Sequence, residues 1–258
     1  MLMKRIRVIP VLLIHKGGLV KSKKFRNYQY LGDPINAVKI FNEKEIDEII
    51  VLDIDATREN RGPHMDQLKL ITGEAFIPLA YGGGITNIDQ VKDLFYLGVE
   101  KVIFNNSALE NPGLITEAAK LAGSQSVVVS IDYKKNLFGK RKVYGLNGTK
   151  VYSEDIVTYA QKMETYGAGE IFLNAIDHDG TYLGYDQVTI KELCGKLNIP
   201  VVVCGGASGF NDFEQAVKNG ASAVAAGSLF VFQRPHYAVL ISYPSQNELK
   251  EKFYSKLR

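Results

Sequence analysis

The sequence has little of what several classes of protein require. Among its 258 residues only Cys194 and Cys204 are cysteines, which is too few for a disulfide framework, and the sequence shows no spacing typical of a zinc site. No apolar run approaches the roughly 18 residues of a membrane span, and no export signal opens the chain. We therefore expect a cytoplasmic protein with no metal site and no bound cofactor.

A large excess of charge of one sign is also missing. Lysine and arginine number 31 against 28 acidic residues, for a net charge of +3. So small a charge predicts neither a nucleic acid nor a membrane surface as a partner. With 46% hydrophobic residues and no Pro/Ser-rich linker, residues 1–258 are expected to form one globular domain.

What the sequence does contain is a regular alternation of short β-branched runs with longer stretches of helical period. This pattern is typical of repeated βα units around a parallel sheet. Eight strands are predicted, over residues 7–14, 48–54, 76–81, 101–105, 126–132, 170–175, 200–204 and 223–227. Eight such units in about 250 residues fit a (β/α)₈ barrel, and an open doubly wound sheet is the alternative.

An internal repeat favours the barrel over the open sheet. One offset of 122 residues joins Glu48 to Glu170, Pro78 to Pro200, Gly83-Gly84 to Gly205-Gly206, Gly98 to Gly220, and Asn105-Asn106 to Gly227-Ser228. A repeat of half the chain is natural in a barrel built of two halves and unexpected in an open sheet. We therefore predict a single barrel with a two-fold half-barrel repeat.

Small residues end four of the predicted strands and suggest anion sites. In a barrel the chemistry lies at the carboxyl ends of the strands, and there glycines leave backbone N–H groups open to an oxyanion. Two phosphates on opposite sides would belong to one long phosphorylated substrate, and the plainer alternative is that the glycines only permit tight turns. We call the two groups the first rim (Gly83, Gly84, Asn105, Asn106) and the second rim (Gly205, Gly206, Gly227, Ser228).

Carboxylates end other strands and are candidates for acid–base chemistry. Asp132, which closes "VVVSID", is the clearest candidate for a general acid or base. A helix cap or a salt-bridge partner of Lys134 and Lys135 is the alternative role. Asp179, in "AIDHDGT", could orient substrate or act as an acid. By the half-barrel logic the partner of Asp132 is the end of the first strand, which is Leu13.

These motifs resemble those of one known family. In order along the chain, "DEIIVLDI", "GGGI", "NNSALENP", "SQSVVVSID", "IDHDGTYLGYD" and "AAGSLF" are similar to the cyclase subunit of imidazole-glycerol-phosphate synthase, a glutamine amidotransferase of histidine biosynthesis. The resemblance implies a heterodimer with a glutaminase subunit, whose ammonia passes up through the barrel. At the mouth the ammonia would meet a phosphoribulosyl substrate, which is cleaved and cyclised.

The resemblance also assigns roles to residues at the mouth. It implies phosphate contacts at the first rim and at the second rim, which it extends by Asp179 and Gly180, and a flexible-loop lysine, Lys21, that closes on substrate. The family's acid–base pair would be Asp132 and position 13. There the usual "CLDV" is "VLLI", and leucine can neither donate nor accept a proton. His15 could replace the missing acid by reaching back, although an exposed loop histidine is the simpler expectation. Asn106 stands where the family usually has a small hydroxyl residue.

A ring of charge at the other end of the barrel is implied as well. The family's ammonia gate would consist of Arg7, Glu48, Lys101 and Glu170. Two acids opposite two bases would neutralise one another, as buried charges must. A structural ion-pair cluster that plugs the barrel is the alternative.

Three hypotheses of function follow. The first is a divergent cyclase-like subunit that receives ammonia and supports amidation of a phosphorylated or nucleotide-linked substrate, a kind of relative that occurs in the making of amidinated surface sugars. The second is an authentic histidine-pathway lyase. The third is a non-catalytic channel and phosphate-binding subunit. Residues 133–150 are expected to form a mobile loop or hairpin over the active face, and residues 247–257 a final amphipathic helix with Leu249, Phe253 and Leu257 on one face.

Overall fold

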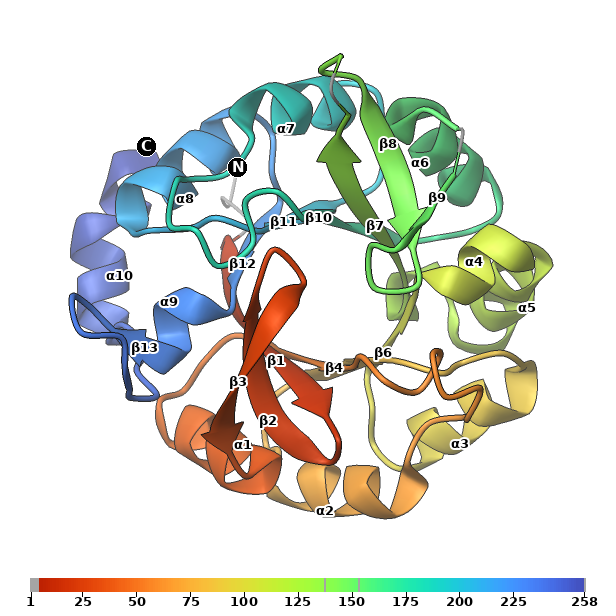
Figure 1. Cartoon of the computed structure of the whole chain (residues 1–258), viewed down its shortest axis with the longest axis horizontal. Coiled ribbons are helices and arrows are strands. Elements are labelled where there is room, and N and C mark those ends of the chain that lie inside the picture. The colour runs from red at the N-terminus through yellow and green to blue at the C-terminus, as the bar shows by residue number, and fades with distance from the viewer. Residues whose placement is uncertain (1–4, 137, 153, 258) are drawn as a thin grey trace.

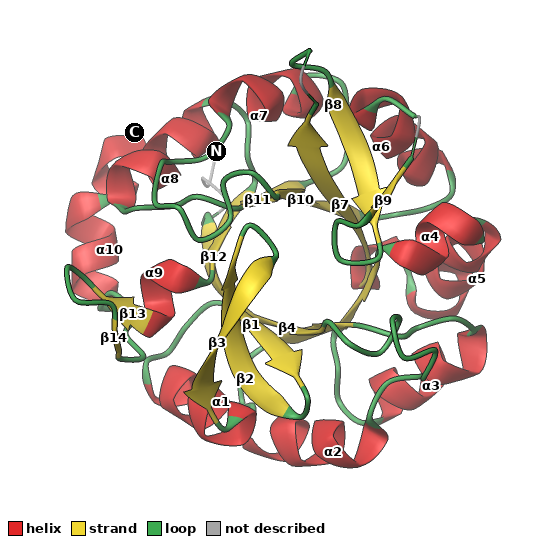
Figure 2. Cartoon of the chain, in the orientation of Figure 1, coloured by secondary structure: helices red, strands yellow, loops and turns green. Residues whose placement is uncertain are grey.

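Eight parallel strands close into a barrel in the computed structural model, which describes residues 5–136, 138–152 and 154–257 (Figure 1). Strand β12 pairs with β1, and β7 pairs with β10, so the sheet has no open edge among these eight strands. Helices surround the barrel of strands on the outside (Figure 2). The predicted barrel is therefore confirmed, and the open sheet is excluded. The barrel strands are β1 (Arg7–His15), β4 (Ile49–Asp53), β5 (Leu79–Gly82), β6 (Lys101–Phe104), β7 (Val127–Lys135), β10 (Glu170–Ala175), β11 (Val201–Cys204) and β12 (Ala223–Ala226).

Two predicted strand boundaries differ from the observed ones by three residues, and the others agree to within one. Strand β5 begins at Leu79, not at Phe76, because Ala75 still caps the preceding helix and Phe76 is 82% exposed. Strand β7 runs on to Lys135 because its end pairs with an antiparallel neighbour, β8 (Arg141–Gly145).

Several of the helices that cover the barrel begin at polar caps. Asp33, Asn87 and Asp155 each accept a hydrogen bond from a backbone N–H of the first helical turn, which satisfies donors that the helix itself leaves unpaired. The helices are α1 (Pro34–Glu43), α2 (Met65–Glu74), α3 (Ile88–Tyr96), α4 (Asn106–Glu110), α5 (Gly113–Ala122), α6 (Ile156–Thr165), α7 (Gln187–Cys194), α8 (Phe210–Lys218), α9 (Ser228–Val231) and α10 (Gln246–Lys252). None of the described helices is both long and apolar enough to cross a membrane.

Side chains of each strand alternate between two apolar cores. On β1, Ile9, Val11 and Leu13 belong to a small core inside the barrel, whereas Val8 and Leu12 pack outward against the helices. This alternation is what a strand's two-residue period requires. It places Leu13 inside the barrel, one step above Val11.

Hairpins extend two of the barrel strands beyond the mouth. Strand β1 turns into β2 (Gly18–Lys23) and β3 (Arg26–Gly32), and β7 turns into β8 and β9 (Lys150–Val151). Of the mobile loop or hairpin expected within residues 133–150, the structure shows the hairpin, although Leu137 lies outside the described residues. The first hairpin was not predicted, since its sequence read as a glycine turn.

The end of the chain forms a shorter helix than predicted. Helix α10 stops at Lys252, and Tyr254–Leu257 form a separate 3₁₀ turn. Leu249 and Phe253 are fully buried, and Leu257 packs partly buried on the same core. The predicted apolar face exists, but the helix breaks at Phe253, whose backbone leaves the α region.

The half-barrel repeat reappears as matching close contacts. A Cβ on Gly83 would lie 2.4 Å from the carbonyl oxygen of Asp53, and one on Gly205 would lie 2.6 Å from that of Ala175. Both glycines have φ in the left-handed region, at +132° and +93°. The two contacts are again 122 residues apart, so the repeat in sequence is a repeat in structure.

Candidate active site

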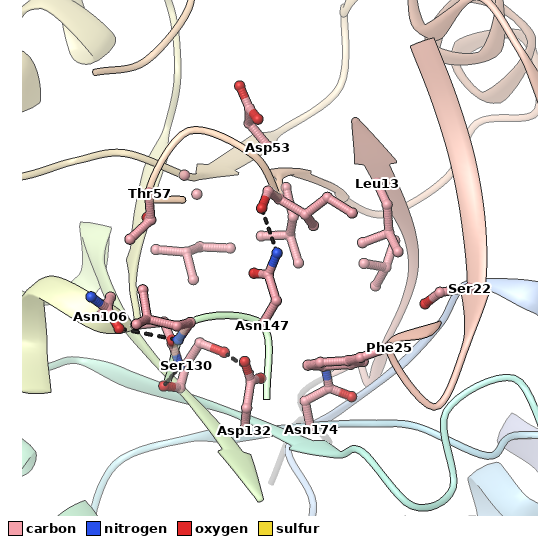
Figure 3. Close-up of a pocket in the computed structure, with 18 of the residues that line it drawn as sticks. Leu13, Ser22, Phe25, Asp53, Thr57, Asn106, Ser130, Asp132, Asn147 and Asn174 are labelled. Atoms are coloured by element: carbon pink, nitrogen blue, oxygen red, sulfur yellow. Dashed lines mark hydrogen bonds between the residues drawn. The ribbon is translucent and has the colours of Figure 1, made fainter. Parts of the chain in front are cut away.

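A pocket of about 1000 Å³, counted out to its open mouth, lies at the carboxyl ends of the barrel strands. Figure 3 shows Leu13, Ser130, Asp132 and Asn174 among the residues that line it, with Phe25 drawn between Leu13 and Asn174. The pocket is therefore where a barrel carries its chemistry.

Asp132 lies in the wall of this pocket, on the part of β7 that faces the interior. The Ser130 hydroxyl donates to its Oδ1 at 3.2 Å. Burial raises the pKa of Asp132 to about 7; hydrogen bonds from Ser130 and Asn174 oppose the shift and the nearby Asp179 adds to it. A carboxyl group with such a pKa can hold or release a proton near neutral pH.

Two other carboxylates line the pocket, and both are neutralised. Asp53 pairs with both terminal nitrogens of Arg61, at 2.8 and 3.1 Å. Asp179 accepts from the Lys21 ammonium at 2.7 Å and from the Ser22 hydroxyl at 3.1 Å. Of the carboxylates in the described pocket wall, Asp132 alone has no ion-pair partner.

Leu13 lies on the pocket wall at 9% exposure. It pairs with Val20 where β1 enters its hairpin, and Asp132 pairs with Tyr144 where β7 enters the other hairpin. The two positions are therefore structural counterparts. The position opposite Asp132, where a second acid–base group was sought, therefore holds the hydrocarbon side chain of Leu13.

His15 does not fill that place. Its Nδ1 lies 2.8 Å from Asp55 Oδ1, and its ring stacks on Tyr28 with 4.8 Å between ring centres. It is not among the residues that line the pocket. The expectation that His15 is an exposed loop residue is also wrong. Its side chain is only 21% exposed, because Asp55 contacts the edge of the ring and Tyr28 its face.

The first rim lies in the pocket wall as predicted from the strand ends. Gly83, Gly84, Asn105 and Asn106 all line the pocket. The Asn105 amide donates to the Ser130 carbonyl at 3.1 Å, and Asn106 Oδ1 accepts from the backbone N–H of Leu146 at 3.2 Å. Asn106, the residue that departs from the small hydroxyl, thus holds the tip of the hairpin over the mouth.

The second rim surrounds a smaller cavity beside the main pocket. Its lining brings together all six residues assigned to it, namely Asp179, Gly180, Gly205, Gly206, Gly227 and Ser228. Gly227 precedes α9 as its N-cap residue, as Asn105 precedes α4, and neither residue makes a side-chain cap hydrogen bond. Both therefore leave backbone N–H groups without a helical partner.

Lys21 is placed differently from the expected loop lysine. It lies in strand β2, is buried, and already pairs with Asp179. The expectation of a loop at this position is wrong, because residues 18–32 pair with one another and with β1 as strands. The ammonium group does face the second rim, with the carbon chain of Lys21 packed on Gly227.

Arg7, Glu48, Lys101 and Glu170 form a closed ring at the opposite end of the barrel. Arg7 bonds both glutamates, and the Lys101 ammonium lies 3.0 Å from Glu48 and 2.8 Å from Glu170. Both glutamates are buried, so the pairing neutralises charges that would otherwise be costly there. The four residues predicted from the sequence are thus in mutual contact.

Sequence reasoning missed several residues of the pocket wall. Asn174 faces Asp132 across the β7–β10 pair, is 7% exposed, and has no hydrogen-bond partner for its Oδ1. Phe25 and Tyr28 line the pocket from the unpredicted hairpin. Arg61, from the loop after β4, does not line the pocket but pairs with Asp53, which does. The one feature of the sequence that could have pointed to Asn174 is that this polar residue stands near the end of the otherwise apolar strand "EIFLNA".

A closed (β/α)₈ barrel, whose described pocket wall holds one carboxylate without an ion-pair partner between two glycine-rich rims, has the plan of a barrel enzyme. The family model described as "Histidine biosynthesis protein" matches residues 7–235. The chain therefore belongs to this family.

Relatives in the same family carry more specific names. A protein of Pseudomonas aeruginosa named "Putative imidazole glycerol phosphate synthase subunit hisF2" is 48% identical over 251 residues, which cover 96% of this chain and 99% of that protein. A Leptospira interrogans protein with a similar name is 46% identical over 257 residues, 98% and 100% of the two chains. "Imidazole glycerol phosphate synthase subunit HisF" of Clostridium botulinum is 39% identical over 251 residues, 96% and 97% of the chains. The chain is thus an enzyme subunit of the cyclase type, with the character of a divergent paralogue.

Proposed function

We propose that this chain is the ammonia-accepting subunit of a glutamine-dependent synthase. A glutaminase partner would form a heterodimer with it, ammonia would enter through the ring of Arg7, Glu48, Lys101 and Glu170, and a phosphorylated substrate would lie between the two rims. The names of the relatives as synthase subunits and the intact ring support this proposal. The apolar interior of the barrel between the ring and the pocket is compatible with a neutral guest such as ammonia.

The single observation that carries the finer proposal is Leu13 in the place opposite Asp132. Cleaving and cyclising a phosphoribulosyl compound needs protons moved on both sides of the reacting centre, and the position opposite Asp132 holds a leucine, which cannot move them. Loss of one general acid or base costs on the order of 10²–10⁴ in rate. We therefore propose that the reaction has changed.

Amidation needs less acid–base chemistry than cyclisation. The ammonia nitrogen adds through its own lone pair to an electrophilic carbon of the substrate that carries an activated leaving group such as a phosphate. The C–N bond forms, the bond from carbon to the leaving group breaks with its electron pair going to that group, and the nitrogen loses one proton. Asp132, the pocket carboxylate without an ion-pair partner, is the base for that proton. On this account the substrate is a phosphorylated or nucleotide-linked sugar, and a precursor of a surface sugar is the candidate to test first.

A turnover assay tests the proposed change of reaction. The purified protein is given the phosphoribulosyl substrate of the histidine pathway with an ammonium salt, and imidazole-glycerol phosphate is measured against a cyclase with an acid at the position of Leu13. We expect a rate at least about 10² lower than that cyclase. A rate within about tenfold would show an authentic histidine-pathway lyase. Failure of phosphate to bind either rim would instead leave a subunit without a substrate site.

A further inference from the structure

Arg234 lies beside the second rim, in the turn between β13 (Phe232–Gln233) and β14 (Ala238–Val239). Its guanidinium carbon is 4.6 Å from the centre of the Tyr182 ring, and its Nη2 donates to the Ser208 carbonyl at 3.1 Å. One contact holds the flat face of the guanidinium group and the other holds one edge. The group is therefore fixed in orientation although the residue is exposed.

Tyr182 connects Arg234 to the second rim. Its side chain lines the small cavity, and its hydroxyl donates to the Ser228 carbonyl at 2.9 Å. The backbone φ of Tyr182 is +58°, a conformation that a bulky residue rarely adopts. The side chain of Tyr182 thus touches both the cavity and the guanidinium group, and its position depends on an unusual backbone conformation.

Arg234 has no counter-charge among the described residues. No carboxylate forms an ion pair with it there, and only one of its five N–H donors is used, by Ser208. A guanidinium group with a stacked face and free edge donors is well suited to bidentate contact with a phosphate. A single phosphate in the glycine-lined cavity would leave this group without a role.

The surface just outside Arg234 is apolar. Tyr237 meets the Tyr182 ring edge-on, with 5.9 Å between ring centres, and is more than half exposed. Leu183, the neighbour of Tyr182, is also exposed. Exposed aromatic and aliphatic side chains next to a phosphate site suit the flat face of a nucleobase.

We propose that Arg234 forms a subsite for a second phosphate, so that the second rim binds the diphosphate of a nucleoside-diphosphate-linked compound. The inner phosphate, which carries the reacting group, lies in the glycine-lined cavity. The outer phosphate contacts Arg234, and the nucleoside lies outward against Tyr237 and Leu183. This assignment rests on the proposed function, because it takes the second rim as a phosphate site.

Calorimetric titration of the full chain with inorganic phosphate, pyrophosphate and adenosine 5′-diphosphate tests the assignment. We expect pyrophosphate to bind about tenfold or more tightly than phosphate. Arg234→Gln should lose about tenfold or more in affinity for pyrophosphate and the nucleotide, and less than about twofold for phosphate. Arg234→Lys keeps the charge without the planar fork and should recover only part of the loss.

Lys196→Gln is the matched control, since it removes one exposed positive charge at the base of the barrel. An equal loss of pyrophosphate affinity in both variants would mean a general charge effect and would overturn the subsite. Phosphate binding together with unchanged pyrophosphate binding in Arg234→Gln would overturn the subsite and leave the proposed function intact. A chain that binds no phosphate at all would overturn both. Binding of pyrophosphate without binding of the nucleotide would overturn the nucleoside assignment.

Discussion

Leu13 and Asp132 point into one pocket from opposite sides of the barrel, each from a strand that continues into a hairpin. The sequence alone predicted that position 13 opposes Asp132, because the half-barrel repeat relates the two strand ends. It could not predict that Asp132 is the carboxylate without a cation. That depends on Arg61 and Lys21, which reach Asp53 and Asp179 from other elements.

The raised pKa of Asp132 predicts a specific pH dependence of stability. In the unfolded chain an aspartate releases its proton near pH 4, whereas in the folded protein Asp132 keeps it until about pH 7. Between these values the unfolded state binds fewer protons, so the free energy of unfolding falls as pH rises and levels off above about pH 8. Asp132→Asn removes this loss.

Urea unfolding from pH 4 to pH 8 measures the effect. Relative to the wild type, Asp132→Asn should gain stability as pH rises, on the order of 4 kcal/mol at most. A difference between the two proteins that is the same at pH 4 and pH 8 would show that burial does not hold the proton on Asp132.

At the scale of elements, the hairpin of β8 and β9 spans the mouth. Its tip is tied to the first rim through Leu146 and Asn106, and to the end of β4 through the Asn147 amide, which donates to the Ile54 carbonyl at 2.6 Å. The sequence predicted a mobile loop or a hairpin here from its glycines and polar residues. It could not predict the anchors, because residues 54 and 147 are joined by no sequence pattern.

Asn147→Ala should loosen this hairpin without unfolding the barrel. Loss of one hydrogen bond of ordinary strength corresponds to about tenfold faster local opening. Hydrogen–deuterium exchange of residues 141–151 is the measurement, with the barrel strands as internal reference. Lys150 lies in the same hairpin and makes an exposed ion pair with Glu110 of α4. Lys150→Ala, which removes this pair, should leave the exchange unchanged. Equal exchange in the Asn147 variant and the wild type would mean that this anchor does not hold the hairpin.

At the scale of the whole molecule, the two-fold repeat explains what could be predicted. The barrel and both rims follow from one offset of 122 residues, whereas the four ring residues were expected from the resemblance to the cyclase family. The hairpin of β2 and β3 lies outside the matched region, and it brings Phe25, Tyr28 and the strand position of Lys21 into the site. Because the repeat does not cover this hairpin, its contribution to the site was not predicted.

The ring at the base should contribute to global stability. Lys101→Met leaves the buried Glu48 and Glu170 with Arg7 as their one remaining cation in the ring. Removal of one partner from a buried ion pair costs about 3–5 kcal/mol, and urea unfolding at pH 7 measures it.

Two comparisons make that measurement specific. Lys92→Met, which removes an exposed pair with Asp89, should cost less than about 1 kcal/mol. The double variant Glu48→Gln, Lys101→Met should lose less free energy of unfolding than the two single variants together, because it removes one negative and one positive charge at once. A Lys101→Met cost as small as that of the exposed pair would mean that water screens the ring.

The most direct test of the central claim is to return an acid to position 13. Leu13→Asp and Leu13→Asn are compared with the wild type in the formation of imidazole-glycerol phosphate from the phosphoribulosyl substrate and ammonium. If the missing proton carrier is what changed the reaction, Leu13→Asp gains about 10² or more in rate, while Leu13→Asn, of similar size but unable to carry the proton, gains nothing. Equal rates for Leu13→Asp and Leu13→Asn would contradict the account.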